Sequence, residues 1–174
     1  MAESQGNPQG LDLDRLRVFL ETECPGLVTG PLSAEVIQGG KSNITYRVSD
    51  GVGRWVVRRP PLGHVLATAH DMVREHRVIS ALLPTSVPVP ATLALCADPA
   101  VIGAPFYVME LMPGTPYRHA HELETLGPER ARAISTRVVE VLADLHAVRP
   151  AEVGLTDFGR PEGFLARQVQ RWKK

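Results

Sequence analysis

The chain has 174 residues, of which 44% are hydrophobic and 22% are charged, so a wholly disordered polypeptide is excluded. Its 19 Lys and Arg residues balance 19 Asp and Glu residues, which argues against a protein that binds nucleic acid through backbone phosphates. No apolar run approaches the roughly 20 residues that cross a bilayer, and the polar start of the chain does not resemble a signal peptide. We therefore expect a cytoplasmic protein of about one domain, without nucleic-acid or membrane partners.

The first two thirds of the chain alternate between helix and strand patterns. Residues 1–10 are polar and are expected to be disordered, and a short amphipathic helix is predicted over 11–24. The later elements are strands at 32–38, 44–48 and 55–58, a helix at 69–83, and strands at 92–96 and 105–110. Thr68 and Asp71 stand in capping-box spacing at the start of the second helix. Cys24 and Cys96 lack metal-ligand spacing and are interpreted as buried thiols.

A Pro/Gly segment at residues 113–116 predicts a hinge between two domains. The first domain would hold the sheet over 11–112, and the second would begin a helical domain over 117–174. Residues 129–147 show helical periodicity, with Pro128 near the first turn. The apolar face of this helix needs a partner, so self-association through 129–147 is predicted.

One glycine-rich turn lies between the first two predicted strands and reads Gly39, Gly40, Lys41, Ser42 and Asn43. Adjacent glycines let backbone N–H groups converge on an anion, and the lysine and serine add a charge and a donor. A Walker A loop would need a glycine in place of Glu35 and a helix after the turn, whereas residues 44–48 alternate like a strand. The P-loop interpretation is therefore rejected. Two alternatives remain, a lid over nucleotide phosphates and a plain hairpin turn.

Glu75 falls within the apolar stripe of the second helix, together with Met72, Ile79 and Leu82. An ionised carboxylate that faces a core is costly unless it is paired. Arg58, at the end of the third strand, is the natural partner, and its guanidinium could hold both a carboxylate and a phosphate. The alternative is that Glu75 lies at the rim of the interface and reaches water.

The strand over 105–110 runs directly into the Pro113-Gly114 hinge. Unpaired backbone groups in such a connector could recognise the edge of a purine base. A plain strand end explains the same pattern equally well.

Taken together, these segments resemble the aminoglycoside-phosphotransferase-like kinase family over about residues 32–172. The matching strings are GGKSNITYRV, WVVRRPPLGHVLATAHDMVREHRVISAL and VPVPATLALCADPAVIGAPFYVMELMPG, and the second is similar to the branch associated with acyl-CoA dehydrogenases. The resemblance implies an α+β, protein-kinase-like fold. Its N-terminal lobe has a five-stranded antiparallel sheet and one helix equivalent to the kinase C-helix, and it is followed by the first helices of an incomplete helical lobe.

The resemblance also implies roles for individual residues. The glycine-rich turn would cover the phosphates of ATP, while Arg58 would take the place of the third-strand lysine of kinases and Glu75 that of its helix partner. Glu110 and Met112 would offer a backbone carbonyl and N–H to adenine, and Met109 would line the back of the pocket. The implied reaction is ATP-dependent O-phosphorylation of a small-molecule hydroxyl, for which a hydroxyacyl-CoA is one acceptor.

Two departures from the family pattern shape the expected activity. The turn lacks the full GxGxxG pattern, and the catalytic loop of the family, with its Asp base and metal-binding Asn, is expected only after Trp172. Asp157-Phe158-Gly159 spells the magnesium-binding triplet of protein kinases, but no catalytic loop precedes it, so it is interpreted as an ordinary loop. We expect a truncated chain without catalytic residues or turnover, and Mg²⁺ only in the complete enzyme. The alternative is a non-catalytic nucleotide-binding or interaction module.

Overall fold

The computed structural model describes residues 7–39, 42–63, 70–160 and 162–173. The chain divides into two compact units, the first formed by Met1–Leu83 and Val89–Tyr117 and the second by Pro84–Pro88 and Arg118–Lys174. The sequence placed the hinge at 113–116, so the observed division falls just after that segment.

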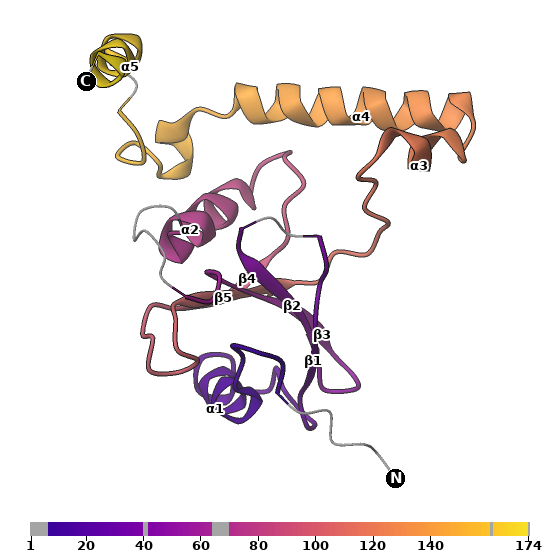
Figure 1. Cartoon of the computed structure of the whole chain (residues 1–174), viewed down its shortest axis with the longest axis vertical. Helices are drawn as coiled ribbons and strands as arrows, with labels where there is room; N and C mark the ends of the chain where they lie inside the picture. The colour runs from indigo at the N-terminus through magenta and orange to yellow at the C-terminus, as the bar shows by residue number, and fades with distance from the viewer. Residues whose placement is uncertain (1–6, 40–41, 64–69, 161, 174) are drawn as a thin grey trace. The chain divides into compact units, whose positions relative to one another are not determined.

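A five-stranded antiparallel sheet, as predicted, forms the centre of the first unit (Figure 1). Its strands are β1 (Ser33–Val36), β2 (Ile44–Ser49), β3 (Arg54–Arg59), β4 (Thr92–Cys96) and β5 (Phe106–Glu110). The order across the sheet is β1-β2-β3-β5-β4, and every neighbouring pair is antiparallel. The first three strands form the expected meander, and β5 lies between β3 and the edge strand β4.

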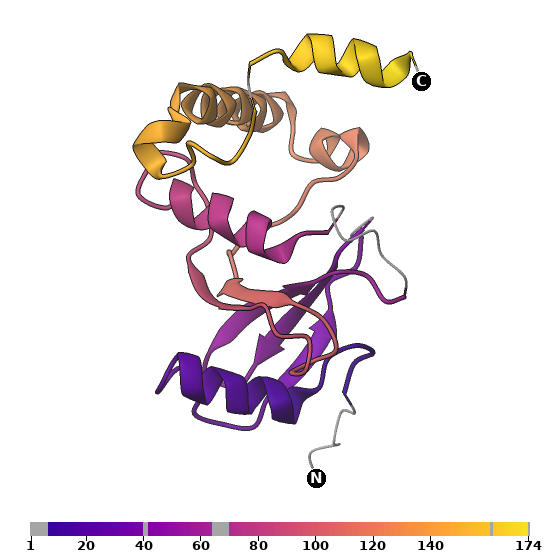
Figure 2. The ribbon, with the colours of Figure 1, turned by 90° about the vertical axis from the view of Figure 1, so that its left-hand side faces the viewer.

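Two helices, α1 (Leu13–Glu23) and α2 (Met72–Leu82), cover opposite faces of this sheet (Figure 2). Each begins after an aspartate whose side chain accepts a hydrogen bond from a backbone N–H three residues later, Asp12 from Arg15 and Asp71 from Arg74. Asp71 is thus the N-cap of α2, so the helix starts three residues later than predicted. Thr68, the other member of the predicted capping box, lies outside the described residues.

The hydrophobic core lies between α1 and one face of the sheet. Its largest fully buried side chains are Leu16 and Leu20 of α1 together with Tyr46, Val48, Val57, Phe106 and Val108 of the strands. These strand residues occur at alternate positions because successive side chains of a strand point to opposite faces. The intervening residues are therefore directed to the α2 face, and burial of each large apolar side chain stabilises the fold by about 1.5–3 kcal/mol.

The segment before α1 is held on the α1 face of the sheet by two buried side chains. Arg59 donates through Nη1 to the carbonyl oxygens of Gly10 and Ile102, and the Tyr46 hydroxyl donates to the carbonyl of Gln9 at 2.6 Å. Residues 7–10 therefore differ from the expectation of disorder over 1–10, while residues 1–6 lie outside the described part of the chain.

Gly10 can be tested by comparison with a second glycine. Both Gly10 and Gly26 have positive φ, +81° and +84°, but a Cβ at Gly10 would lie 2.6 Å from Leu62 Cδ2 and 2.9 Å from Arg59 Nη1, whereas none of the described atoms approaches Gly26 within 4 Å. Gly26→Ala should cost about 1–2 kcal/mol of unfolding free energy through backbone strain alone. Gly10→Ala should cost about 2–4 kcal/mol because crowding is added. Urea denaturation measures both, and equal losses would contradict the close packing at Gly10.

A buried carboxylate joins the turn between β2 and β3 to the segment after α1. Asp50 accepts hydrogen bonds from the backbone N–H groups of Thr29, Gly30, Val52 and Gly53 at 2.6–3.3 Å. These bonds, led by that from Thr29, hold the pKa of Asp50 well below its usual range.

This lowered pKa predicts a pH-dependent contribution to stability. Because the pKa of Asp50 is lower in the folded than in the unfolded chain, its contribution is complete above the unfolded pKa of about 4 and is lost as the pH falls through the folded pKa. Asp50→Asn removes this contribution. The stability gap between wild type and Asp50→Asn should therefore shrink from about pH 6 to about pH 3 in urea denaturation. A gap that stays constant over this range would show that the bonds do not favour the charged form.

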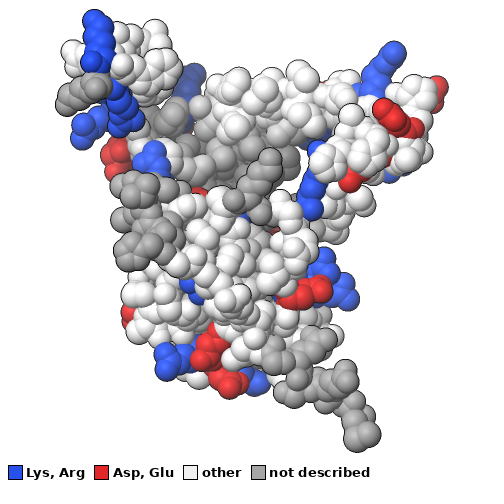
Figure 3. Space-filling model, viewed as in Figure 1, with Lys and Arg blue, Asp and Glu red and all other residues white. Residues whose placement is uncertain are grey.

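The second unit is helical, with α3 (Ala120–Glu124), α4 (Pro128–Ala147), the 3₁₀ helix η1 (Pro150–Val153) and α5 (Phe164–Trp172). The long helix α4 agrees with the prediction over 129–147, and Val138, Val139 and Leu142 on it are exposed. Figure 3 shows Lys and Arg side chains gathered on α5, whose Leu165 and Trp172 are also exposed.

Asp157-Phe158-Gly159 lies outside any helix or strand. Among the described residues, no helix is both long and apolar enough to span a membrane.

Candidate functional site

A row of three side chains crosses the sheet on its α2 face. In the strand register Thr45 of β2 lies opposite Arg58 of β3, and Arg58 lies opposite Tyr107 of β5. Arg59, the next residue of β3, faces α1 instead and binds Gly10. The alternation of the strand thus sends two adjacent guanidinium groups to opposite faces.

Glu75, in the first turn of α2, is the centre of the hydrogen bonds above this row. Its Oε2 accepts from Arg58 Nε at 2.9 Å and from the Tyr107 hydroxyl at 3.2 Å. Its Oε1 accepts from Asn43 Nδ2 at 2.7 Å. The structure therefore brings together the predicted Arg58–Glu75 pair, and donors from three separate segments of the chain hold one carboxylate.

This ion pair is half-buried, whereas the sequence favoured a carboxylate turned into the core. The side chain of Arg58 is 29% exposed and that of Glu75 is 34% exposed. Both interpretations of the sequence are thus partly realised, because Glu75 is paired and also lies at the edge of the interface. Water screens the pair, so breaking it costs less than breaking a fully buried one.

Two further residues complete the surroundings of the pair. Arg58 Nη1 donates to Thr45 Oγ1 at 3.0 Å, and His70 Nδ1 lies 2.5 Å from Asn43 Oδ1. Thr45, Tyr107 and His70 were not predicted as site residues, and Asn43 was assigned to the phosphates. The strand register alone would have shown that Thr45 and Tyr107 flank Arg58. It does not show that Glu75 lies above these residues, because that depends on how α2 is rotated about its axis over the sheet.

The protonation states around Glu75 follow from burial. Tyr107 is buried, and this burial, reinforced by the negative charge of Glu75, raises the pKa of its phenol well above the ordinary value. The phenol therefore stays protonated and donates to the carboxylate. Burial also lowers the pKa of His76, whose ring lies 6.0 Å from that of Tyr107, so the neutral imidazole is favoured there. Among these groups, Arg58 supplies the positive charge that is present across the physiological pH range.

The glycine-rich turn follows β1 and leads to Asn43. Gly39 has φ +94°, a conformation that favours glycine, and Ile37 N–H donates to the Thr45 carbonyl at 2.8 Å where the hairpin closes. β1 ends at Val36, two residues earlier than predicted. Ser42 is exposed, while Gly40 and Lys41 lie outside the described residues. A strand follows this turn, in agreement with the rejection of a P-loop.

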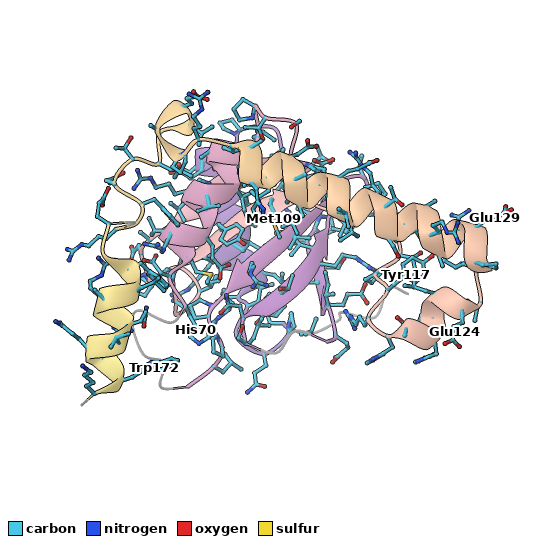
Figure 4. The ribbon with its side chains drawn as sticks, turned by 90° about the horizontal axis from the view of Figure 1, so that it is seen from above. His70, Met109, Tyr117, Glu124, Glu129 and Trp172 are labelled. Carbon is cyan, nitrogen blue, oxygen red and sulfur yellow. The ribbon has the colours of Figure 1, made fainter. Side chains whose placement is uncertain are left out.

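The remaining predicted residues lie at the end of β5. Met109, labelled with His70 in Figure 4, is half-buried and pairs in register with Val56. The Glu110 N–H donates to the Ala91 carbonyl at 2.8 Å, and Met112 is exposed two residues beyond the strand. Met109 and Glu110 thus belong to β5 and Met112 follows it, and in the described part of the chain no hydrogen bond joins these three residues to the Arg58–Glu75 pair.

Within the described ranges, no group of three or more His, Cys, Asp or Glu side chains is placed to hold a metal ion.

Comparison with known proteins identifies the class to which this architecture belongs. The model of a family described as "Phosphotransferase enzyme family" matches residues 33–174. A solved structure from Ralstonia eutropha, titled "Crystal structure of a putative aminoglycoside phosphotransferase", superposes with a TM-score of 0.75 at 32% identity, covering 93% of this chain and 46% of that one. The chain belongs to this phosphotransferase family, and its kinase-like fold is confirmed.

The chain is also similar in sequence to part of several proteins named as acyl-CoA dehydrogenases. "Acyl-CoA dehydrogenase family member 10" of Mus musculus is 40% identical over 161 residues, which are 92% of this chain and 15% of the relative. "Probable acyl-CoA dehydrogenase IBR3" of Arabidopsis thaliana is 39% identical over 170 residues, which are 94% of this chain and 20% of the relative. The predicted resemblance to this branch is thereby confirmed, and the chain spans at most a fifth of the length of these two relatives.

The coupling between Arg58 and Glu75 can be measured with a double-mutant cycle. Arg58→Met and Glu75→Gln should each lower the free energy of unfolding by about 1–3 kcal/mol, since the first leaves the half-buried carboxylate without its cationic donor and the second removes the negative charge that Arg58 faces. Together they should cost at least about 0.5 kcal/mol less than the sum of the single losses.

The matched control for this cycle is the exposed ion pair between Arg47 and Glu35 on the same sheet, whose N–O distance is 2.6 Å. Its coupling should be about 0–1 kcal/mol and should fall with added salt. Additive losses for Arg58 and Glu75 in urea denaturation would mean that their bond does not contribute to stability.

Proposed function

We propose that this chain supplies the ATP-holding part of a phosphotransferase that moves the γ-phosphoryl group of ATP to a hydroxyl group of a small molecule. The observation that carries this proposal is the bond between Arg58 and Glu75, which anchors a guanidinium on the α2 face of the sheet. The family of the chain supports the reaction class.

Arg58 would bind phosphate through the guanidinium nitrogen that its bonds to Glu75 and Thr45 do not use. Nε is used by Glu75 and Nη1 by Thr45, so Nη2 is the nitrogen that we assign to a phosphate oxygen. The two anchors hold the planar group in one orientation, which reduces the conformational entropy lost on binding. The glycine-rich turn, Gly39 to Asn43, would add backbone N–H donors above the phosphates.

The adenine base would be held by the end of β5. We assign the Glu110 carbonyl and the Met112 N–H to the polar edge of the base, and the Met109 side chain to its apolar face. Met112 is exposed beyond the strand, which supports a ligand contact at this segment.

A hydroxyacyl-CoA is the acceptor that we propose. The support comes from two relatives that are named as acyl-CoA dehydrogenases and that match this chain over 15% and 20% of their own length. The family reaction uses ATP with Mg²⁺, which neutralises phosphate charge when bound. No catalytic loop occurs between residues 115 and 156, so we expect no turnover by the 174-residue chain alone.

An interaction module is the second candidate, favoured by the exposed apolar side chains of α4, among them Val138, Val139 and Leu142. Self-association through this helix would bury them. Sedimentation velocity tests this candidate, since a compact monomer at all concentrations would exclude it.

ATP affinity tests the proposed function directly. Isothermal titration should detect ATP binding by the wild-type chain, and Arg58→Met should raise the Kd at least about tenfold because a charge-assisted hydrogen bond is lost. Arg58→Lys keeps a cation but loses the planar group that the two anchors orient, so its Kd should lie between those of wild type and Arg58→Met. Arg15→Met, on α1 at the opposite face of the sheet, is the matched control and should leave the Kd unchanged. Equal affinities for wild type and Arg58→Met would contradict the proposed role of Arg58.

A further inference from the structure

Asn43 links the glycine-rich turn to α2 through two hydrogen bonds of its side chain. It is the last residue before β2 and is 6% exposed, although its neighbour Ser42 in the turn is exposed. One end of its amide lies 2.7 Å from Glu75 Oε1, and the other lies 2.5 Å from His70 Nδ1. A polar side chain buried at this depth, between the turn and the helix, joins two segments that are 32 residues apart in the sequence.

The chemistry of the three groups fixes the direction of both bonds. An ionised carboxylate only accepts hydrogen bonds, so the NH₂ group of Asn43 faces Glu75 and its carbonyl oxygen faces His70. That oxygen also only accepts, so His70 must carry a proton on Nδ1. His70 Nδ1–H therefore donates to Asn43 Oδ1, and Asn43 Nδ2–H donates to Glu75 Oε1.

We propose that Asn43 is a positioning residue that ties the glycine-rich turn to the carboxylate orienting Arg58, and that His70 supports it as the Nδ1–H tautomer. The consequence for a ligand rests on the proposed function. A triphosphate would need the turn and the Arg58 guanidinium at a fixed separation, and both are attached to Glu75. Without Asn43 the backbone at residues 42–43 would no longer be tied to Glu75, and the apparent affinity would fall in proportion to the fraction of molecules in the competent arrangement.

The loss of Asn43 should separate affinity from stability. Glu75 Oε2 keeps its bonds to Arg58 and Tyr107 in the absence of Asn43, so the ion pair and the contact between α2 and the sheet remain. If the role of Asn43 were purely structural, its loss would lower the stability of the unit, and the molecules that remain folded would bind the ligand with unchanged affinity.

The tautomer of His70 provides a test that does not depend on any ligand. Nitrogen-15 NMR of the histidine rings at about pH 8, where a free imidazole is neutral, distinguishes protonated from unprotonated ring nitrogens. The resonances of His70 among the six histidines are identified by their loss in His70→Gln. We expect Nδ1 to be protonated in the wild type and the Nε2–H form to increase in Asn43→Ala. An Nε2–H tautomer in the wild type would overturn the proposal, whether or not any variant folds.

ATP titration then tests the positioning role. Asn43→Ala should raise the Kd for ATP about tenfold, as expected when a tenth of the molecules hold the turn correctly. Asn7→Ala is the matched control. The Asn7 side chain accepts a hydrogen bond from Leu13 N–H at the start of α1, so its loss should leave the Kd unchanged. An unchanged Kd for Asn43→Ala would overturn the positioning role. Absence of ATP binding by the wild type would instead refute the proposed function, and the NMR result would still decide the bond directions.

Discussion

The carboxylate of Glu75 is the constraint on which the α2 face of the sheet depends. A charge at the edge of a helix–sheet interface needs donors, and no single strand provides them. Arg58 comes from β3, Tyr107 from β5 and Asn43 from the start of β2, so the carboxylate is satisfied only when all three segments and α2 are in place. The same bonds that stabilise α2 on the sheet therefore also orient the one guanidinium that we assign to a phosphate.

The neighbouring arginines of β3 show how strictly this arrangement depends on register. Arg58 and Arg59 differ by one position, yet Arg58 meets Glu75 and Arg59 meets the backbone of Gly10 on the opposite face. If β3 shifted its register by one residue, Arg58 and Arg59 would exchange faces. Arg58 would then point away from α2 and lose its bond to Glu75. Because both arginines are engaged, the register of β3 is specified by polar groups as well as by the apolar core.

Much of the first unit could be predicted from local patterns. Alternation identified the strands, helical spacing identified α1 and α2, and the position of Glu75 in an apolar stripe indicated that it needed a partner. The errors have local causes as well. The cap of α2 is Asp71, so the helix begins later than its capping-box spacing suggested, and residues 7–10 are held by side chains of distant strands that composition does not reveal. The degree of burial of the ion pair could not be read from periodicity, because it depends on where the helix end meets the sheet edge.

The sequence by itself determined the elements, the family and the pairing of Arg58 with Glu75, because these rest on residue spacing and on the cost of an unpaired charge. Only the tertiary structure decided that Asn43 and Tyr107 share the same carboxylate and that His70 stands behind Asn43. The physical reason is that hydrogen bonds act over about 3 Å. Contacts between segments more than 25 residues apart become defined only when strand register and helix phase are combined in space.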